Sequence, residues 1–477
     1  MAGRYGGPWR RARVWTAAGL FFLAAACSVG PNYVRPPAVV PEAFKEMEGW
    51  RVAQPKDQTL RGRWWEIFND PRLNELEEQV NVSNQNIAAS EAQFRQALAL
   101  VQVARSAYFP TVTLGPSFTR SFQSNPLAPS VPVSLTSLPV SASWEPDLWG
   151  RIRRTVEGSR ASAQASAADL EGARLSAQTS VAQDYFQLRA LDALKALLDQ
   201  AVVAYRESLR LTQNRYDSGV ASRGDVLQAD TQLKTTQAQA IDVGVQRAQF
   251  EHAIALLIGK PPSGFSFDFQ PLEGLPPAVP VGLPSELLER RPDIAAAERL
   301  MAAANAQIGV ALSAYYPSLT LGASAGYQSV DLAKLLTWPS RFWSVGPSVS
   351  EVVYEGGLRS AQTAQARAAY DGAIATYRQT VLTGFQQVED NLAALRILEQ
   401  EAGAQDSAVK AAEQSLEVIT NQYKSGTVAY LNVIVAQTTV LSNRETAANI
   451  LGRRMTAAVL LISALGGGWT SPYLAGE

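Results

Sequence analysis

The feature that most constrains this chain is an internal duplication with an offset of 207 residues. When residues 84–115 are laid over residues 291–322, 15 of the 32 positions are identical. The same offset aligns residues 214–219, Asn-Arg-Tyr-Asp-Ser-Gly, with residues 421–426, Asn-Gln-Tyr-Lys-Ser-Gly. One constant offset across distant segments indicates two copies of one folding unit with few insertions.

Long helices are predicted in both copies. In the first copy an Ala- and Gln-rich helical stretch covers about 72–107, and a tract without proline runs from Arg151 to about Tyr216. A helix of about 65 residues would be roughly 100 Å long. Such a length suits a protein that crosses a wide compartment, because a globular domain has no need of it.

Two strands are predicted in each copy, because apolar and small polar side chains alternate with a period of two. The predicted strands cover about 110–123, 137–148, 317–329 and 343–354. One face is apolar and the other is small and uncharged, which is the pattern of a strand between lipid and a water-filled lumen. A soluble sandwich with one wet face shows the same alternation and stays an alternative.

Four membrane strands cannot close a barrel by themselves. An open sheet edge in lipid leaves backbone groups unpaired, at a cost of several kcal/mol for each group. Two chains would supply eight strands and three chains would supply twelve, with room for a pore. The predicted fold is therefore an α+β membrane protein that works as an oligomer, with an internal two-fold repeat.

The composition describes a folded chain, with 47% hydrophobic and 18% charged residues. Residues 1–26 contain four arginines and no acid, so the remaining chain has 38 basic and 43 acidic residues and a net charge of −5. Proteins that bind nucleic acid usually carry the opposite sign. The balance excludes that class of partner.

The first 26 residues have the pattern of a signal peptide: a charged start, a short apolar core at 14–23 and small residues before Cys27. The segment Leu23-Ala24-Ala25-Ala26-Cys27 resembles the lipobox of bacterial lipoproteins, so Cys27 is the predicted lipidation site. The alternative is an ordinary cleaved signal. It would leave the only cysteine unpaired in an oxidising compartment.

Short motifs recur in a fixed order along the chain. They are Cys27-Ser28-Val29-Gly30-Pro31, Trp64-Trp65 with Asp70-Pro71, Tyr108-Phe109-Pro110 and Tyr315-Tyr316-Pro317, Asp147-Leu148-Trp149-Gly150-Arg151, Arg291-Pro292-Asp293, and the ending Ala464 to Trp469. In this order, and duplicated, they resemble the outer-membrane efflux proteins, which are TolC-like, and most closely the OprM/NodT type of efflux lipoprotein.

This resemblance implies a passive exit duct of a tripartite efflux system that contains an inner-membrane transporter of the resistance-nodulation-division (RND) class. It implies a homotrimer in the outer membrane of a Gram-negative bacterium, with a 12-stranded β-barrel among the lipids and a long antiparallel α-helical barrel in the periplasm. The expected partners are a periplasmic adaptor (a membrane fusion protein) and the RND transporter. The expected cargo is small molecules such as drugs or toxic compounds.

The resemblance also implies how the chain is divided. The predicted parts are the signal peptide 1–26, a lipid-anchored equatorial segment 27–70, the first repeat 71–260, a proline-rich equatorial connector 261–292, the second repeat 293–466 and a tail 467–477.

In the resembled family, the turn after each long helix forms a periplasmic gate. The candidate gate residues here are Asp225, Tyr423, Tyr430, Leu431 and Asn432, with Gly219 and Gly426 marking the turns. A polar link between Asp225 and Tyr423 is implied for the closed state, while a helix N-terminal capping role for Asp225 is an alternative. Positions that often hold a locking arginine and aperture acids carry Val428, Asn432 and Val435 instead.

Catalytic chemistry has little support in the sequence. His252 is the only histidine and is predicted to pack between helices, and no cofactor or metal site and no enzyme activity is expected. Three other functions stay open: a type I protein-secretion duct, a structural envelope lipoprotein without a pore, and an enzyme that uses Glu145 and Asp147. Arg151, Arg153 and Arg154 are candidates for contacts with lipid headgroups or for a solvated basic face.

The missing aperture acids lead to a prediction about ion selectivity. Because a ring of carboxylates concentrates cations, and Asn432 and Val435 carry no charge, we expect a weakly cation-selective aperture that Tyr430 and Leu431 help to close. The measurement is the reversal potential of single channels in a KCl gradient. Strong cation selectivity would contradict this expectation.

Overall fold

A computed structural model describes residues 28–37, 40–41, 43–46, 62–122, 132–279 and 291–467. The predicted signal peptide, Cys27, part of the connector and most of the tail lie outside the described residues. The chain divides into two compact units. The first contains residues 1–37, 94–166 and 296–377, and the second contains residues 38–93, 167–295 and 378–477.

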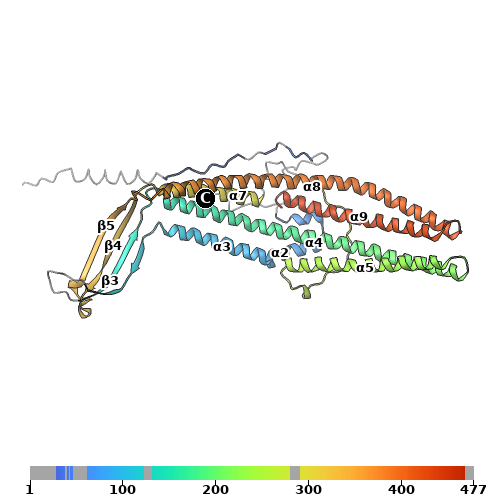
Figure 1. Cartoon of the computed structure of the whole chain (residues 1–477), viewed down its shortest axis with the longest axis horizontal. Coiled ribbons are helices and arrows are strands. Elements are labelled where there is room, and N and C mark those ends of the chain that lie inside the picture. Colours follow the sequence, from blue (N-terminus) through green and yellow to red (C-terminus); the bar gives the residue numbers. More distant parts are fainter. Residues whose placement is uncertain are drawn as a thin grey trace, which may run out of the picture. The chain divides into compact units, whose positions relative to one another are not determined.

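The duplication determines the helix boundaries. Three helices of the first copy each have a partner of equal length that begins and ends 207 residues later. The pairs are α3 (Gln85–Ser106) with α7 (Pro292–Ser313), α4 (Arg151–Asp217) with α8 (Leu358–Lys424), and α5 (Arg223–Leu257) with α9 (Tyr430–Ala464). Within the second unit, α5 runs back alongside α4, and α9 runs back alongside α8 (Figure 1).

The longest helices, α4 and α8, have 67 residues each, which corresponds to about 100 Å. Small side chains allow their neighbours to approach closely. A Cβ atom at Gly452 on α9 would lie 2.9 Å from the Cβ atom of Ala190 on α4. None of the helices in the described part of the chain is both long and apolar enough to cross a membrane.

The predicted helix over about 72–107 is divided in two. The chain forms α2 (Pro71–Ser83) and α3, with Asn84 in an extended conformation between them. The Asn84 side-chain oxygen accepts hydrogen bonds from the backbone N–H groups of Asn86 (2.9 Å) and Ile87 (3.1 Å), and its amide donates to the carbonyl oxygen of Leu257 (2.7 Å). Asn84 therefore caps α3 and fixes the break.

The first unit contains one antiparallel sheet in the order β1-β3-β4-β5, with β2 also paired to β3. The strands are β1 (Thr111–Leu114), β2 (Ser117–Ser121), β3 (Val133–Trp144), β4 (Ser318–Ser329) and β5 (Arg341–Ser350). The predicted strand 110–123 is interrupted at Gly115-Pro116, because proline has no N–H group for the ladder. The predictions 137–148 and 343–354 placed their strands a few residues too late.

The connector in the second unit is held by hydrogen bonds from its backbone to charged side chains of the helices. The Asp192 carboxylate is fully buried and accepts from Arg247 (2.7 Å) and from the backbone N–H of Gln270 (3.0 Å). Arg189 donates to the carbonyl oxygen of Asp268 at 2.8 Å. These contacts attach the described part of the connector to α4, and the Asp192–Arg247 pair joins α4 to α5. The connector ends one residue earlier than predicted, because Pro292 begins α7.

One buried carboxyl in the second unit lacks a visible partner. Glu77 on α2 has no exposed surface, and neither side-chain oxygen has a hydrogen-bond partner among the described residues. Burial raises the pKa of Glu77 well above its ordinary value of 4.5. The uncharged acid is therefore favoured in the folded state.

This gives a prediction about stability and pH. Below pH 4.5 the Glu77 carboxyl is protonated in both the folded and the unfolded state. Above pH 4.5 it ionises in the unfolded chain, and this ionisation stabilises the unfolded state relative to the folded one. Glu77→Gln should therefore raise the free energy of unfolding by about 1–3 kcal/mol at pH 7.5, with the gain vanishing near pH 4. Urea unfolding of the detergent-solubilised protein, followed by circular dichroism, measures the difference. The exposed Glu91 on α3 supplies the control Glu91→Gln, and a loss of stability in Glu77→Gln at pH 7.5 would contradict the expectation.

Candidate functional site

The register of the sheet separates apolar from polar side chains. Residues opposite each other in an antiparallel ladder lie on the same face. Two rows of one face run across the sheet as Val112–Ala142–Ala323–Val345 and Leu114–Val140–Ala325–Trp343. Trp343 is 79% exposed in the single chain. The first unit therefore presents a continuous apolar face with no cover among the described residues.

The other face of the sheet carries small uncharged groups. Its rows are Thr111–Ser143–Gly322–Gly346 and Thr113–Ser141–Ser324–Ser344. The Ser141 hydroxyl lies 3.3 Å from the Ser324 hydroxyl, so polar side chains bond across the strands. A face of this kind is suited to contact with water.

The outer edges of the sheet are formed by β1 with β2 on one side and by β5 on the other. Each of these strands pairs with only one neighbour among the described residues. Their outward N–H and C=O groups are therefore available to another strand.

Two short turns in the second unit join the long helices. In the first turn, residues 218–222, Gly219 has a φ of 75° that glycine adopts without strain. The carbonyl oxygen of Arg215 accepts from the N–H groups of Val220 (2.8 Å) and Ala221 (3.1 Å). The Ser222 hydroxyl accepts from the Asp225 N–H (3.2 Å) while the Asp225 carboxylate accepts from the Ser222 N–H (3.0 Å). This reciprocal capping box fixes the start of α5.

The second turn, residues 425–429, repeats the backbone path but not the cap. Gly426 has a φ of 79°, and the N–H of Thr427 donates to the carbonyl oxygen of Gln422 at 2.9 Å. The N-cap position of α9 is Ala429, which has no side-chain acceptor. The start of α9 therefore lacks the bonds that stabilise the start of α5.

An apolar cluster supports the second turn instead. Tyr423 and Tyr430 are buried with Val433 and Ala229, and the two ring centroids lie 5.2 Å apart. Burial is the main cause that raises the pKa of Tyr430. The Tyr423 hydroxyl is buried without a hydrogen-bond partner among the described residues. These rings join the two helix pairs near the turns.

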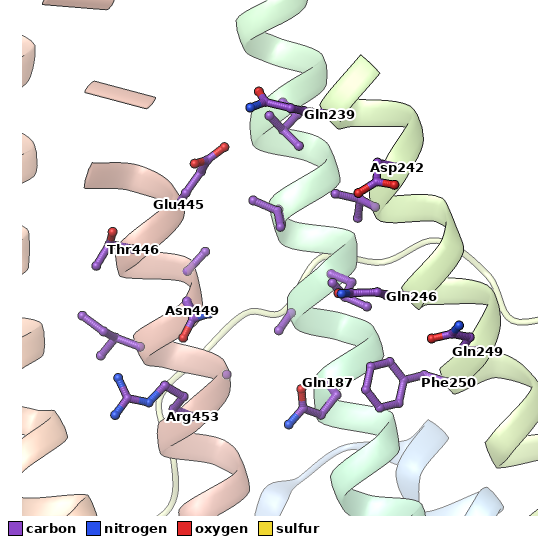
Figure 2. A pocket seen from close by; sticks show the side chains of 18 of the residues that line it. Gln187, Gln239, Asp242, Gln246, Gln249, Phe250, Glu445, Thr446, Asn449 and Arg453 are labelled. Atoms are coloured by element: carbon purple, nitrogen blue, oxygen red, sulfur yellow. The ribbon is translucent and has the colours of Figure 1, made fainter. Parts of the chain in front are cut away.

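A cavity of 760 Å³ lies further along the helices of the same unit. Figure 2 shows Asp242 and Glu445 on the two helices that flank α4, which are α5 and α9. Burial raises the pKa of Glu445, and Glu401 pairs with Arg453 at 3.6 Å. Amide side chains line much of the remaining wall: Gln187, Gln239, Gln246, Gln249 and Asn449. In the described residues no group of histidine, cysteine and acidic side chains is arranged to hold a metal ion.

Comparison with known proteins gives the decisive observation. Residues 76–260 and 283–467 each match the family described as outer membrane efflux protein. The chain belongs to this family. The two matched segments cover nearly all of both repeats and lie 207 residues apart, which explains the constant offset.

Individual relatives agree with the family match. The chain is 30% identical over 458 residues to the toluene efflux pump outer membrane protein TtgC of Pseudomonas putida, covering 94% of each protein. It is 28% identical to the pyoverdine export outer membrane protein OpmQ of Pseudomonas aeruginosa, covering 94% of this chain and 97% of that one. The structure of the outer-membrane channel OprN matches with a TM-score of 0.87 and 30% identity, covering 93% of this chain and all of that chain.

The protein is thus an outer-membrane efflux channel of the type found in Gram-negative bacteria. The predicted family is confirmed, and so is the architecture of long helices with a sheet. Members of this family are channels, and catalytic activity is not part of their description.

The structure places the predicted gate residues in the two turns or within three residues of them. Asp225 is the third residue of α5 in a capping box, and no hydrogen bond joins it to Tyr423 in the described residues of the single chain. The Asp225–Tyr423 link stays a prediction. Leu431 is 54% exposed and Asn432 is also exposed, whereas Tyr430 is 3% exposed and packs inside the chain. The Tyr430 ring therefore lies in the cluster with Tyr423, and a role of Tyr430 and Leu431 in closing the aperture stays a prediction.

Other candidates also have different surroundings from those expected. Arg154 is buried and donates to the carbonyl oxygens of Val29 (3.3 Å) and Gly30 (3.2 Å), so it does not face lipid headgroups. Asp147 accepts from the backbone N–H of Ile152 (3.0 Å) at the start of α4 and pairs with Arg153. Its capping role leaves little support for paired catalysis with Glu145.

His252 is exposed on α5 and does not pack between helices of the chain. The sequence did not predict that the side chain of Arg215 donates to the carbonyl oxygen of Lys424 (3.2 Å). The signal was present in the duplication, because Arg215 aligns with Gln422 inside an otherwise similar segment.

The asymmetry of the caps is testable. Ala429→Ser combined with Asn432→Asp recreates in α9 the pair that caps α5, and should stabilise its first turn by about 1 kcal/mol. Hydrogen–deuterium exchange of residues 430–434 should become slower, with no change in residues 223–227. Ala429→Ser alone serves as the control and should give a smaller effect. Unchanged exchange in the double variant would show that the start of α9 is already fully stabilised.

Proposed function

We propose that three copies of this chain form the exit duct of an RND-type tripartite efflux pump. Their sheets close into a 12-stranded β-barrel in the outer membrane, and the long helices form an α-helical barrel in the periplasm. The assembly is passive, and its turns at residues 218–222 and 425–429 surround the periplasmic aperture.

The observation that carries this proposal is the open, two-faced sheet of the first unit. Its apolar rows suit lipid and its Ser, Thr and Gly rows suit a water-filled lumen. Its two free edges require partners, because unpaired backbone groups in lipid cost several kcal/mol each. With β1 and β2 counted as one interrupted strand, each chain contributes four strands, so three chains complete the barrel.

The length of the helices supports the periplasmic part. About 100 Å of helix in α4 and α8 suits a duct that reaches across the periplasm. A periplasmic adaptor would bind this helical part, and the RND transporter would supply the energy. Lipidation of Cys27 would add an anchor in the outer membrane.

The cargo we propose is small organic molecules. Relatives that match over nearly their whole length are named for the efflux of toluene and for the export of pyoverdine. Both names describe small organic compounds. Selection among such compounds is a task for the inner-membrane pump, since the duct itself needs no binding site for its cargo.

The test is single-channel conductance of the purified full-length protein in planar bilayers. Wild type should give small gated currents. Asp225→Ala should enlarge them if Asp225 restrains the closed aperture, whereas the matched variant Ser222→Ala removes the cap of α5 and keeps the Asp225 carboxylate.

Equal enlargement in both variants would assign the effect to helix capping and not to a lock. A silent bilayer, from wild-type protein shown to be folded and inserted, would contradict the duct and favour a structural lipoprotein.

A further inference from the structure

Arg215 occupies a special position in the last turn of α4. Its backbone carbonyl oxygen closes the first turn by accepting from Val220 and Ala221. Its side chain reaches the other repeat, where Nη1 donates to the carbonyl oxygen of Lys424 at 3.2 Å. Arg215 therefore closes the first turn through its backbone and, through its side chain, contacts the end of α8 directly before the second turn.

The side chain of Arg215 makes two favourable contacts with the second repeat. Lys424 is the last residue of α8, so the guanidinium lies at the negative end of that helix and bonds one of its unpaired carbonyls. The guanidinium carbon also lies 4.8 Å from the centroid of the Tyr423 ring, a distance at which a cation is attracted to an aromatic face. The half-buried position of Arg215 strengthens both contacts.

The second turn has a particular need for this contact. It lacks a capping side chain at Ala429, while the first turn has its own capping box at Ser222 and Asp225. The duplication does not provide the reverse contact, because the position equivalent to Arg215 in the second repeat is Gln422. The support therefore runs in one direction only, from the Arg215 side chain on α4 to the second turn.

We propose that Arg215 is a positioning residue that holds the second turn of the channel against α4 and so sets the size of the closed aperture. When the Arg215 bridge to Lys424 and Tyr423 is broken, the α8–α9 turn loosens while the first turn keeps its shape. The part of this statement that concerns the aperture depends on the proposed duct function. The part that concerns the turns does not.

The first experiment follows backbone exchange in the full-length protein in detergent. Arg215→Ala removes the side-chain bridge but leaves the Arg215 carbonyl that closes the first turn. Hydrogen–deuterium exchange by mass spectrometry should become about tenfold faster in peptides that report Gly426 and Thr427, which corresponds to about 1.4 kcal/mol. Peptides that report Gly219 and Val220 should exchange as in wild type.

Two further variants separate the effect of the Arg215 contacts from the effect of its positive charge. Arg215→Lys keeps the charge but loses the planar fork of donors, so it should give an intermediate rate. Arg223→Ala removes an exposed arginine at the start of α5, so both turns should exchange as in wild type. Equal acceleration of the two turns in Arg215→Ala, or no acceleration in either, would overturn the proposal.

The second experiment is conductance in planar bilayers with the same variants. Arg215→Ala should increase the open time or the current, Arg215→Lys should do so less, and Arg223→Ala should behave as wild type. Faster exchange in the second turn together with unchanged conductance would overturn the control of the aperture by Arg215. If wild type itself is silent, the duct function fails, and the exchange result still decides whether the bridge holds the turn.

Discussion

The backbone groups on the outer strands of the sheet are the constraint on which the rest depends. A strand in lipid must pair on both sides, because neither water nor another group is present to accept its hydrogen bonds. Within the residues that the structure describes, one chain pairs its strands internally and leaves the outward sides of β1, β2 and β5 open. A protein whose sheet is both two-faced and open is incomplete as a single chain, which makes assembly a physical requirement of the proposed function.

The two repeats have helices of the same length but differ at their turns, and this difference bears on function. Equivalent helices keep the same lengths to the residue, since both copies must span the same distance. The turns differ, however: the first has Ser222 and Asp225 as caps, whereas the second has Ala429 and Asn432 and contacts Arg215. The second turn therefore depends on a contact from the other repeat, whereas the first carries its own cap.

Much of the fold was accessible from the sequence, and the failures have clear causes. Long helices follow from tracts without proline, and strands follow from alternation. The break at Asn84 was not predicted, because its stabilising contact with the Leu257 carbonyl joins positions 173 residues apart. The burial of Tyr430 and Arg154 was missed for the same reason. In the sequence, three neighbouring arginines look alike, and only packing shows that one of them binds the backbone at Val29 and Gly30.

The sequence by itself determined the two-fold repeat, the lengths of the long helices, the two faces of the strands and the family. These properties are local or periodic, so they follow directly from the order of the residues along the chain. The tertiary structure alone decided the register that joins the apolar rows across four strands, the assignment of Asp225 to a cap, and the contact of Arg215 with the second repeat. Each of these depends on which distant groups meet, because a hydrogen bond or a ring contact forms only when folding brings its two partners within a few ångströms.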